Sequence, residues 1–316
     1  MKKIICFLCV LLTLTLLVAC TNTMSDKYSG NDSVQSNQQS LETTFSEEKQ
    51  EESSETTSAI TQSENSQINS SESVNETSID LSKDFNGING CAVWYSTANN
   101  QYFYYNEDLC KKEVSPFSTF KIISALIGLQ ENIIEDKSST MNYNGTQYPN
   151  PEWNNNLNLE QAFQSSCIWY FRKILDEAGE QNVQDILTDL QYGNCDVSEW
   201  EGSGINTIDE LNGFWLDSSL KISPLEQVEV MMKIFERESN LDHSNIEIVK
   251  NIMLISDNGT KKIYGKTGSG NNQAWFVGFT EESNTKDYFA IYLDDKSQES
   301  IITGNTAKEV ALNIFE

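Results

Sequence analysis

The sequence predicts a mixed α/β (α+β) fold in which strands from both ends of the chain form one antiparallel sheet flanked by helices. Short runs rich in aromatic and β-branched residues occur early in the ordered region and again near its end. Between them, apolar residues recur at helical spacing. This arrangement indicates that the two ends meet in the sheet and that the middle of the chain supplies the helices that cover it.

The first predicted strands form a hairpin. Residues 91–95 and 101–105 are short runs of apolar and aromatic residues, and the Thr97-Ala98-Asn99-Asn100 segment between them has the composition of a turn. A helix then begins around Ser118 and continues through apolar residues to Leu129.

Three more helices are predicted in the middle of the chain. Residues 159–178 show helical spacing of apolar side chains, and Gly179 is a plausible stop. A short helix follows over residues 183–190. Another covers residues 224–235, opened by Ser223 and a proline, with a glutamate in its first turn.

The C-terminal part returns to strands. Residues 262–268, 274–279 and 288–293 read as three strands joined by hairpins, and a final helix covers residues 305–315. No internal repeat is visible. The ordered domain is predicted to span residues 79–316.

Residues 1–19 have the organisation of an export signal. Two lysines precede an apolar run over residues 4–19, which is too short and wrongly flanked for a stable membrane span. The ending Leu-Val-Ala-Cys resembles a bacterial lipobox, which implies a lipid on Cys20; an ordinary cleaved signal is the alternative. We therefore expect an exported protein, anchored through Cys20 at the outer face of the cytoplasmic membrane or partly released from it.

Residues 20–78 are predicted to be a disordered tether. They are rich in Ser, Thr, Glu, Asn and Gln, with isolated apolar residues and no period, so they cannot bury enough surface to offset chain entropy. A spacer that holds the domain away from the lipid surface is the preferred interpretation, ahead of a recognition segment.

The charge balance excludes some partners. With 47 acidic and 21 basic residues, the chain is not expected to bind nucleic acid or anionic membrane surfaces through charge. The single histidine, His243, lies in a polar stretch and is predicted to be a solvated loop residue. Without a second histidine, neither a zinc site nor a Ser-His-Asp triad is expected.

Four cysteines lie in the predicted folded part, and their spacing fits neither a stapled scaffold nor metal ligands. Export permits a Cys91–Cys110 bridge across the hairpin. Buried or partly buried thiols are the preferred interpretation for all four, Cys91, Cys110, Cys167 and Cys195.

Ser118-Thr119-Phe120-Lys121 is the leading chemical motif. Its spacing puts a hydroxyl and an ammonium on one helical face, about 5–6 Å apart at their Cβ atoms, so the amine or a derivative of it can take the hydroxyl proton. About one chance Ser-x-x-Lys is expected in a chain of this size, so its weight depends on the motifs that follow it.

Four further motifs follow in the order and at about the spacing of the class D serine β-lactamases, which the chain resembles from about Cys91 to its end. The matching segments are Pro116-Phe117-Ser118-Thr119-Phe120-Lys121-Ile122, Ser166-Cys167-Ile168, Tyr192-Gly193-Asn194, Phe214-Trp215-Leu216 and Lys266-Thr267-Gly268, with the context of residues 220–227. The resemblance implies the fold of serine β-lactamases and penicillin-binding transpeptidases, and hydrolysis of β-lactam antibiotics.

The resemblance also implies the catalytic roles. Ser118 is the nucleophile that forms an acyl-enzyme. Lys121, whose apolar neighbours and helix N-terminus disfavour the ammonium form, is carboxylated by CO₂ or bicarbonate and acts as the base for acylation and deacylation. Ser166 relays protons, and Trp215 orients the carbamate through its indole N–H. No metal and no other cofactor is expected.

Substrate binding is assigned in the same way. Lys266 and Thr267 bind the substrate carboxylate, and Gly268 lets the ligand approach the backbone. The backbone N–H groups of Ser118 and Ser269 form the oxyanion hole.

Other positions are diagnostic or depart from the family. Tyr192-Gly193-Asn194 is a turn that marks the family and is not assigned a chemical step. Ile168 replaces the usual valine, which adds one methylene beside the carbamate. Thr303 stands where the family usually has a carboxylate-binding arginine, and Lys308 or Arg237 are possible replacements.

Three alternative functions remain. The first is a penicillin sensor that acylates without turnover, although such receptors normally add membrane helices and a protease domain. The second is a wall-building transpeptidase, which typically has Ser-x-Asn where this chain has Ser166-Cys167-Ile168. The third is an adhesin on a dead catalytic fold, which an intact Ser118, Lys121 and Lys266 disfavour. The sequence makes no prediction of oligomeric state.

Overall fold

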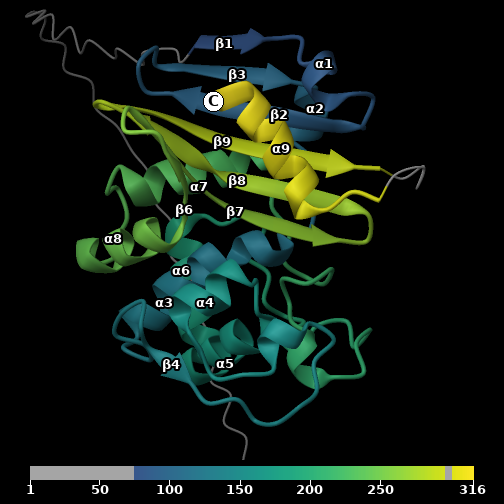
Figure 1. Cartoon of the computed structure of the whole chain (residues 1–316), viewed down its shortest axis with the longest axis vertical. Helices are drawn as coiled ribbons and strands as arrows, with labels where there is room; N and C mark the ends of the chain where they lie inside the picture. Colours follow the sequence, from purple (N-terminus) through teal and green to yellow (C-terminus); the bar gives the residue numbers. More distant parts are fainter. Residues whose placement is uncertain (1–74, 296–300) are drawn as a thin grey trace, which may run out of the picture. The chain divides into compact units, whose positions relative to one another are not determined.

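A computed structural model describes residues 75–295 and 301–316 (Figure 1). The predicted signal peptide, Cys20 and all but the end of the predicted tether lie outside the described residues. The last four residues of that tether, Asn75–Ser78, form strand β1, so order begins before Ile79.

The central feature is a seven-stranded sheet with the order β1-β3-β2-β9-β8-β7-β6. All neighbouring pairs are antiparallel except β1 and β3, which are parallel. Strands from both ends of the domain meet where β2 pairs with β9, which confirms the predicted sheet. The strands are β2 (Gly90–Ser96), β3 (Gln101–Tyr105), β6 (Leu254–Asp257), β7 (Lys261–Gly270), β8 (Gln273–Glu282) and β9 (Thr285–Asp294).

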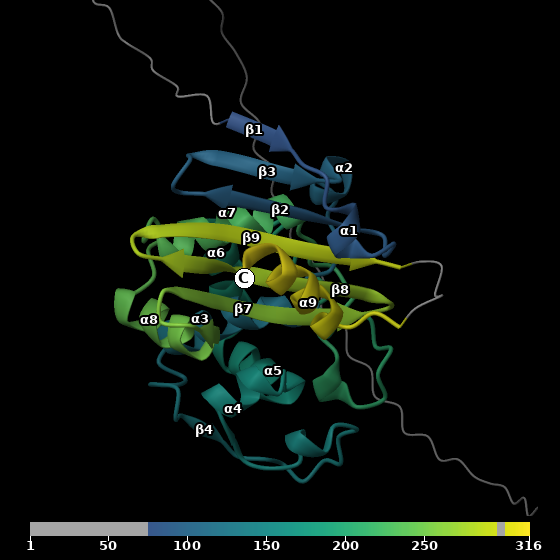
Figure 2. The same cartoon turned by 45° about the horizontal axis from the view of Figure 1, so that its top comes forward.

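Helices cover both faces of this sheet, as Figures 1 and 2 show. Helix α9 (Gly304–Phe315) lies across β7, β8 and β9 on one face, close to α1 (Ser82–Phe85). The other helices lie on the opposite face: α2 (Glu107–Cys110), α3 (Lys121–Gln130), α4 (Leu159–Gln164), α5 (Ile168–Ala178), α6 (Glu180–Leu190), α7 (Pro224–Phe235) and α8 (His243–Ile252).

The alternation of side chains along β8 explains why both faces are apolar. Phe276 packs in the cluster beneath α9, whereas its neighbours Trp275 and Val277 belong to the larger cluster on the opposite face. All three side chains are fully buried. A strand buried on both faces needs a continuous apolar run, which β8 and β9 provide.

The predicted helix over residues 159–178 is wrong in one respect: it is two helices. Asn158 caps α4 in a capping box with Gln161, and the chain then breaks before α5. At the break Ser166 has a φ of 55°, in the left-handed region. The apolar spacing continues across the break because both helices pack on the same core. The periodicity of the sequence therefore gave no sign of the break between α4 and α5.

His243 is exposed, as predicted, but it does not lie in a loop. It is the first residue of α8, whose N-cap Asp242 accepts a hydrogen bond from the backbone N–H of Ser244 at 2.8 Å. The sequence interpretation missed this helix. The features of the sequence that indicate this helix are the Asp-x-Ser start at Asp242 and the apolar positions Ile246 and Val249.

Short elements complete the described chain. Three 3₁₀ turns, η1 (Phe117–Phe120), η2 (Pro151–Trp153) and η3 (Asp209–Leu211), accompany a two-stranded ribbon of β4 (Thr140–Met141) and β5 (Leu157–Asn158). No helix among the described residues is long and apolar enough to cross a membrane.

Candidate active site

Ser118 lies in the 3₁₀ turn η1, immediately before the α-helix that begins with Lys121. The preceding Phe117 has a φ of 48° and is buried, so the chain turns sharply here. We call residues 117–120, which contain the predicted nucleophile Ser118, the nucleophile turn. The Lys121 Nζ lies 2.8 Å from the Ser118 Oγ, which is hydrogen-bond distance. The predicted Ser-Lys pair is therefore assembled.

Lys121 is fully buried, and burial lowers the pKa of its amine from 10.5 to about 7. Its Nζ lies 5.8 Å from the centre of the Phe171 ring, and no acidic side chain among the described residues forms an ion pair with it. Because desolvation penalises the charged form, a large share of the amine is neutral near pH 7. A neutral amine can accept a proton from Ser118.

Trp215 carries a buried indole N–H that has no hydrogen-bond partner among the described residues. The ring packs against Phe120, with centroids 5.9 Å apart. The backbone of Trp215 accepts a hydrogen bond from the N–H of Phe117 at 3.1 Å, which ties this segment to the nucleophile turn. An unsatisfied buried donor costs about 1–3 kcal/mol, so this site is suited to an added acceptor.

Ser166 and Lys266 meet although 100 residues separate them. The Lys266 Nζ hydrogen-bonds the Ser166 Oγ and also the carbonyl oxygen of Thr267 at 2.9 Å. Lys266 is 4% exposed. Burial first, and then the charge of Lys121, hold the pKa of Lys266 well below its usual range. Two lysines in one apolar site thus disfavour simultaneous positive charge.

Ser118 and Ser166 line a cavity of about 350 Å³, whereas Lys121, Trp215 and Lys266 are not part of its lining, and none of the side chains that line it is charged. The nucleophile turn and β7 approach each other here: a Cβ on Gly268 would lie 3.0 Å from the carbonyl oxygen of Pro116. This is tighter than most real Cβ contacts, so a larger residue here would require one of the two backbone segments to shift by a few tenths of an ångström. The cavity is lined by Ser118, Trp153, Ser166, Ile168, Thr267, Gly268, Ser269, Thr303, Gly304 and Asn305.

The sequence interpretation missed Trp153 as a cavity residue. It ends η2, and its indole N–H donates to the carbonyl oxygen of Ser165 at 3.0 Å, next to the break that presents Ser166. Trp169 in turn donates to the carbonyl oxygen of Trp153 at 2.9 Å. The only local signal was a large aromatic residue in a polar, loop-forming stretch.

The Tyr192-Gly193-Asn194 turn does not line the cavity. Gly193 has a φ of 52°, and Asn194 exchanges hydrogen bonds with the backbone of Lys221. Gln227 donates to the Tyr192 hydroxyl at 3.3 Å and to the Thr119 hydroxyl at 3.0 Å. The motif therefore supports the nucleophile turn through hydrogen bonds on the side away from the cavity, and it contributes no group to the cavity.

Thr303, which stands at the position of the missing arginine, and the two possible replacements, Lys308 and Arg237, lie in different places. Thr303 caps α9 and lines the cavity. Arg237 is paired with Glu247 at 3.3 Å and lines another pocket, so it does not replace the arginine. Lys308 lines a groove next to the cavity and is taken up below.

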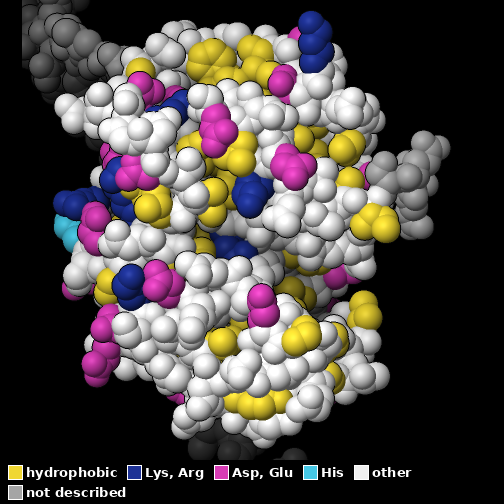
Figure 3. All heavy atoms as spheres, in the orientation of Figure 1, with side chains coloured by type: hydrophobic (Ala, Val, Ile, Leu, Met, Phe, Trp, Pro, Cys, Tyr) yellow, Lys and Arg dark blue, Asp and Glu magenta, His cyan; other side chains and the backbone are white. Residues whose placement is uncertain are grey.

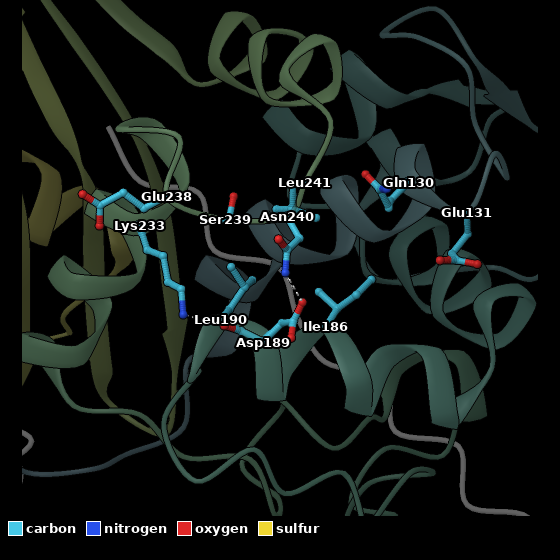
Figure 4. A pocket seen from close by; sticks show the side chains of 10 residues that line it. All are labelled: Gln130, Glu131, Ile186, Asp189, Leu190, Lys233, Glu238, Ser239, Asn240 and Leu241. Carbon is cyan, nitrogen blue, oxygen red and sulfur yellow. Dashed lines mark hydrogen bonds between the residues drawn. The ribbon is translucent and has the colours of Figure 1, made fainter.

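A second pocket, of about 330 Å³, lies at the other end of α3 (Figure 4). Its lining includes Gln130, Asp189 and Asn240, and the amide of Asn240 donates to the Asp189 carboxylate at 3.0 Å. Ser118 precedes the opposite end of this ten-residue helix, about 15 Å away. This pocket contains none of the predicted site residues.

The charged side chains on one face and the thiols of the described chain can be located directly. The face in Figure 3 shows lysine and arginine side chains scattered among acidic ones, without a broad basic patch. In the described ranges no group of His, Cys, Asp and Glu could hold a metal ion. The four cysteines are free thiols, with Cys91, Cys110 and Cys167 buried and Cys195 partly buried.

Curated relatives fall into two groups. The chain is 34% identical over 232 residues to the regulatory protein BlaR1 of Bacillus licheniformis, covering 72% of this chain and 36% of that protein. It is 30% identical over 246 residues to the probable beta-lactamase YbxI of Bacillus subtilis, covering 77% of this chain and 86% of that protein. The chain thus spans about a third of the regulatory relative.

Solved structures give the same two groups. A class D beta-lactamase from Bacillus subtilis superposes with a TM-score of 0.67 at 30% identity, covering 75% of this chain and 94% of that one. The C-terminal domain of the Bacillus licheniformis BlaR penicillin-receptor superposes with a TM-score of 0.67 at 32% identity, covering 76% and 95%.

The penicillin binding protein transpeptidase domain matches residues 82–316, which is the whole described fold apart from β1 and the segment after it. With the Ser-Lys pair assembled on this fold, the chain belongs to the penicillin-binding transpeptidase and serine β-lactamase family.

Proposed function

We propose that this protein hydrolyses β-lactam antibiotics through an acyl-enzyme on Ser118. The observation that carries the proposal is the 2.8 Å contact between Ser118 and a buried lysine whose pKa is lowered to about 7. Such a lysine can activate a hydroxyl without histidine. The relatives named as a probable beta-lactamase and as a class D beta-lactamase support the choice of substrate.

In the proposed acylation, the Ser118 Oγ attacks the lactam carbonyl carbon while the side chain of Lys121, the proposed base, accepts the hydroxyl proton. The lactam C–N bond then breaks, and the ring nitrogen takes a proton, for which the Ser166 hydroxyl, bonded to Lys266, is the proposed relay. The backbone N–H groups of Ser118 and Ser269, which both line the cavity, are the proposed oxyanion hole. Attack by water releases the ring-opened acid and restores Ser118.

We further propose that Lys121 reacts with CO₂, losing one proton to become a carbamate. The residues fit this group, because the amine is buried and partly neutral and the Trp215 indole N–H lacks an acceptor. Lys121 would hold it covalently, and Trp215 would donate to one of its oxygens. When present, the carbamate supplies an anionic base for both acylation and deacylation.

The substrate carboxylate is proposed to bind at the wall formed by Lys266, Thr267 and Thr303. The last two line the cavity, and Lys266, which lines the neighbouring groove, hydrogen-bonds Ser166 and Thr267 of the cavity lining. An arriving carboxylate favours the charged form of Lys266 and offsets the desolvation that lowers its pKa.

A penicillin sensor is the second candidate, because the BlaR1 protein is as similar to this chain as the enzymes are. Both functions need acylation of Ser118, and they differ in whether water then removes the acyl group. Export and a lipid anchor on Cys20 remain part of the proposal, with the anchor holding either activity at the outer face of the membrane.

Turnover of a chromogenic cephalosporin, with intact-protein mass spectrometry in parallel, tests the proposal. We expect many product molecules per protein and a transient acyl adduct that Ser118→Ala abolishes. A single stoichiometric burst with a lasting adduct would establish the sensor instead. A folded protein that forms no adduct with any penicillin or cephalosporin would overturn both functions.

A further inference from the structure

A groove at the edge of β7 borders the active-site cavity. Strand β6 pairs with β7 only as far as Leu254 opposite Tyr264, and the N–H of Gly265 still donates to the carbonyl oxygen of Met253 at 2.9 Å, so on this edge no described strand lies beside Lys266 and Thr267. The groove there has a volume of about 170 Å³. It shares Thr267 and Asn305 with the cavity that contains Ser118.

One wall of this groove, which we call the edge groove, is apolar and exposed. Leu254 and Ile255 are each 43% exposed, and they are two of the four large apolar side chains that the described chain leaves exposed. Single exposed apolar residues are ordinary, but two together in a concavity beside a nucleophile indicate a contact surface for a ligand.

The other wall carries a positive charge. Lys308, on α9, lines the edge groove and is partly buried. Within residues 75–295 and 301–316, no carboxylate lies at ion-pair distance from it, although the chain has a formal net charge of −26. A lysine without an acidic partner, facing an apolar wall, complements an anion carried on an apolar segment.

We propose that the edge groove is an accessory subsite for an apolar substituent that ends in an anionic group, carried by the same β-lactam whose carbonyl reacts with Ser118. This rests on the proposed function and names the substituents that the enzyme favours. Because Thr267 and Asn305 border both spaces, a ligand seated in the cavity reaches Leu254, Ile255 and Lys308 by extending past Thr267.

The test compares matched pairs of cephalosporins that differ only in whether an apolar substituent ends in a carboxylate or in a neutral amide. The readout is the second-order rate constant for acylation of Ser118, followed by intact-protein mass spectrometry, so it needs no turnover. We expect the native protein to prefer the carboxylate member. Lys308→Met, which keeps the length of the side chain, lowers that preference about two- to fivefold.

Two further variants and a salt series separate the contribution of the Lys308 charge from that of the apolar wall. Lys112→Met removes an exposed lysine far from the groove and leaves the preference unchanged. Ile255→Ser slows acylation by compounds with the apolar substituent relative to compounds with a hydrogen there. In the native protein, raising the salt concentration to about 0.5 M reduces the preference, because the ion pair is partly solvent-exposed.

The outcomes distinguish the two proposals. If no compound acylates Ser118, the proposed function itself fails. If acylation proceeds and the preference is absent in the native protein, insensitive to salt, or identical in native protein and Lys308→Met, the edge groove is not the subsite. The salt series needs no variant, so a poorly folded Lys308→Met protein does not prevent a decision.

Discussion

Lys266 on β7 hydrogen-bonds Ser166 across the site, and Ser166 can meet it only because α4 ends before α5 begins. The left-handed backbone at Ser166 turns the chain at that break. A continuous helix over residues 159–178 would not contain such a turn. The break between α4 and α5 therefore places the Ser166 hydroxyl, the proposed proton relay, next to the buried amine of Lys266.

Replacing Trp215 with Phe tests the proposed carbamate. The change removes the unpartnered indole N–H and leaves an aromatic ring. We expect the rate of β-lactam hydrolysis to fall by at least about tenfold, as for loss of a charge-assisted hydrogen bond. Added bicarbonate restores part of the rate because it favours carboxylation of Lys121 by mass action.

Trp94→Phe is the matched control, since Trp94 stacks on Phe103 on the distant part of the sheet. Its hydrolysis rate and its response to bicarbonate stay at native values. A Trp215→Phe protein with native rates in bicarbonate-depleted buffer contradicts the assigned role.

The pH dependence of acylation follows from Lys121. In CO₂-free buffer the acylation rate rises as the pH increases through about 7, because the neutral amine is the base. Stopped-flow measurements with a chromogenic cephalosporin between about pH 5.5 and 9 show this, with the midpoint expected near the lowered pKa. A flat profile contradicts the amine as base.

The same lysine affects stability. Its folded pKa of about 7 lies below the unfolded value of 10.5, so between these pH values the unfolded chain binds the proton and the folded chain does not. The destabilising contribution is therefore complete below about pH 7 and disappears as the pH rises toward 10.5.

We accordingly expect Lys121→Met to gain free energy of unfolding relative to the native protein at pH 7, and to lose that gain at pH 10. The difference changes by up to about 1.4 kcal/mol per pH unit between the two pKa values. Urea unfolding of both proteins in CO₂-free buffer measures it, and a difference that does not vary with pH counts against a neutral Lys121.

Gly193→Ala tests the brace behind the nucleophile turn. A Cβ at Gly193 would lie 2.0 Å from the carbonyl oxygen of Lys221, at a φ of 52°. We expect a loss of at least about 2–3 kcal/mol in the free energy of unfolding, from backbone strain and displacement of Lys221. Denaturant titration measures this loss.

Gly87→Ala is the control for that change, because Gly87 also has a positive φ, of 81°, but a Cβ there meets nothing within 4 Å. Its loss should be confined to the strain of the left-handed conformation, about 1 kcal/mol. Equal losses in the two variants refute the tight contact.

Cys20→Ala tests the predicted lipid anchor. Without the thiol no lipid can be attached, and we expect the protein to move from the membrane fraction to the medium. Fractionation followed by immunoblotting measures the distribution. Unchanged partitioning of the variant rules out lipidation at this position.

The sequence predicted the sheet and the pairing of Ser118 with Lys121, because both depend on local patterns. Apolar runs marked β8 and β9, and the Ser-x-x-Lys spacing alone brings Ser118 to Lys121. The hydrogen bond between Ser166 and Lys266 was not predicted, because nothing local relates residues 100 positions apart.

Other features depend on tertiary packing, which the local pattern does not specify. The α4–α5 break was hidden by apolar spacing that served two helices at once. Trp153 reaches the cavity through hydrogen bonds to Ser165 and Trp169, partners that follow it in the chain by more than a helical turn. The edge groove exists because the pairing of β6 with β7 ends at Leu254. No residue type in the sequence predicts where this pairing ends.

The two buried lysines have a consequence for how ligands are captured. Burial lowers the pKa of Lys266 in the empty site, and an incoming anion favours its ammonium form, so binding of the anion is coupled to proton uptake from solvent. Capture of an acidic drug then consumes hydrogen ions, and its affinity weakens in alkaline medium even though the drug itself stays fully ionised. Calorimetry in buffers of differing ionisation enthalpy would register this uptake as a heat that scales with the buffer.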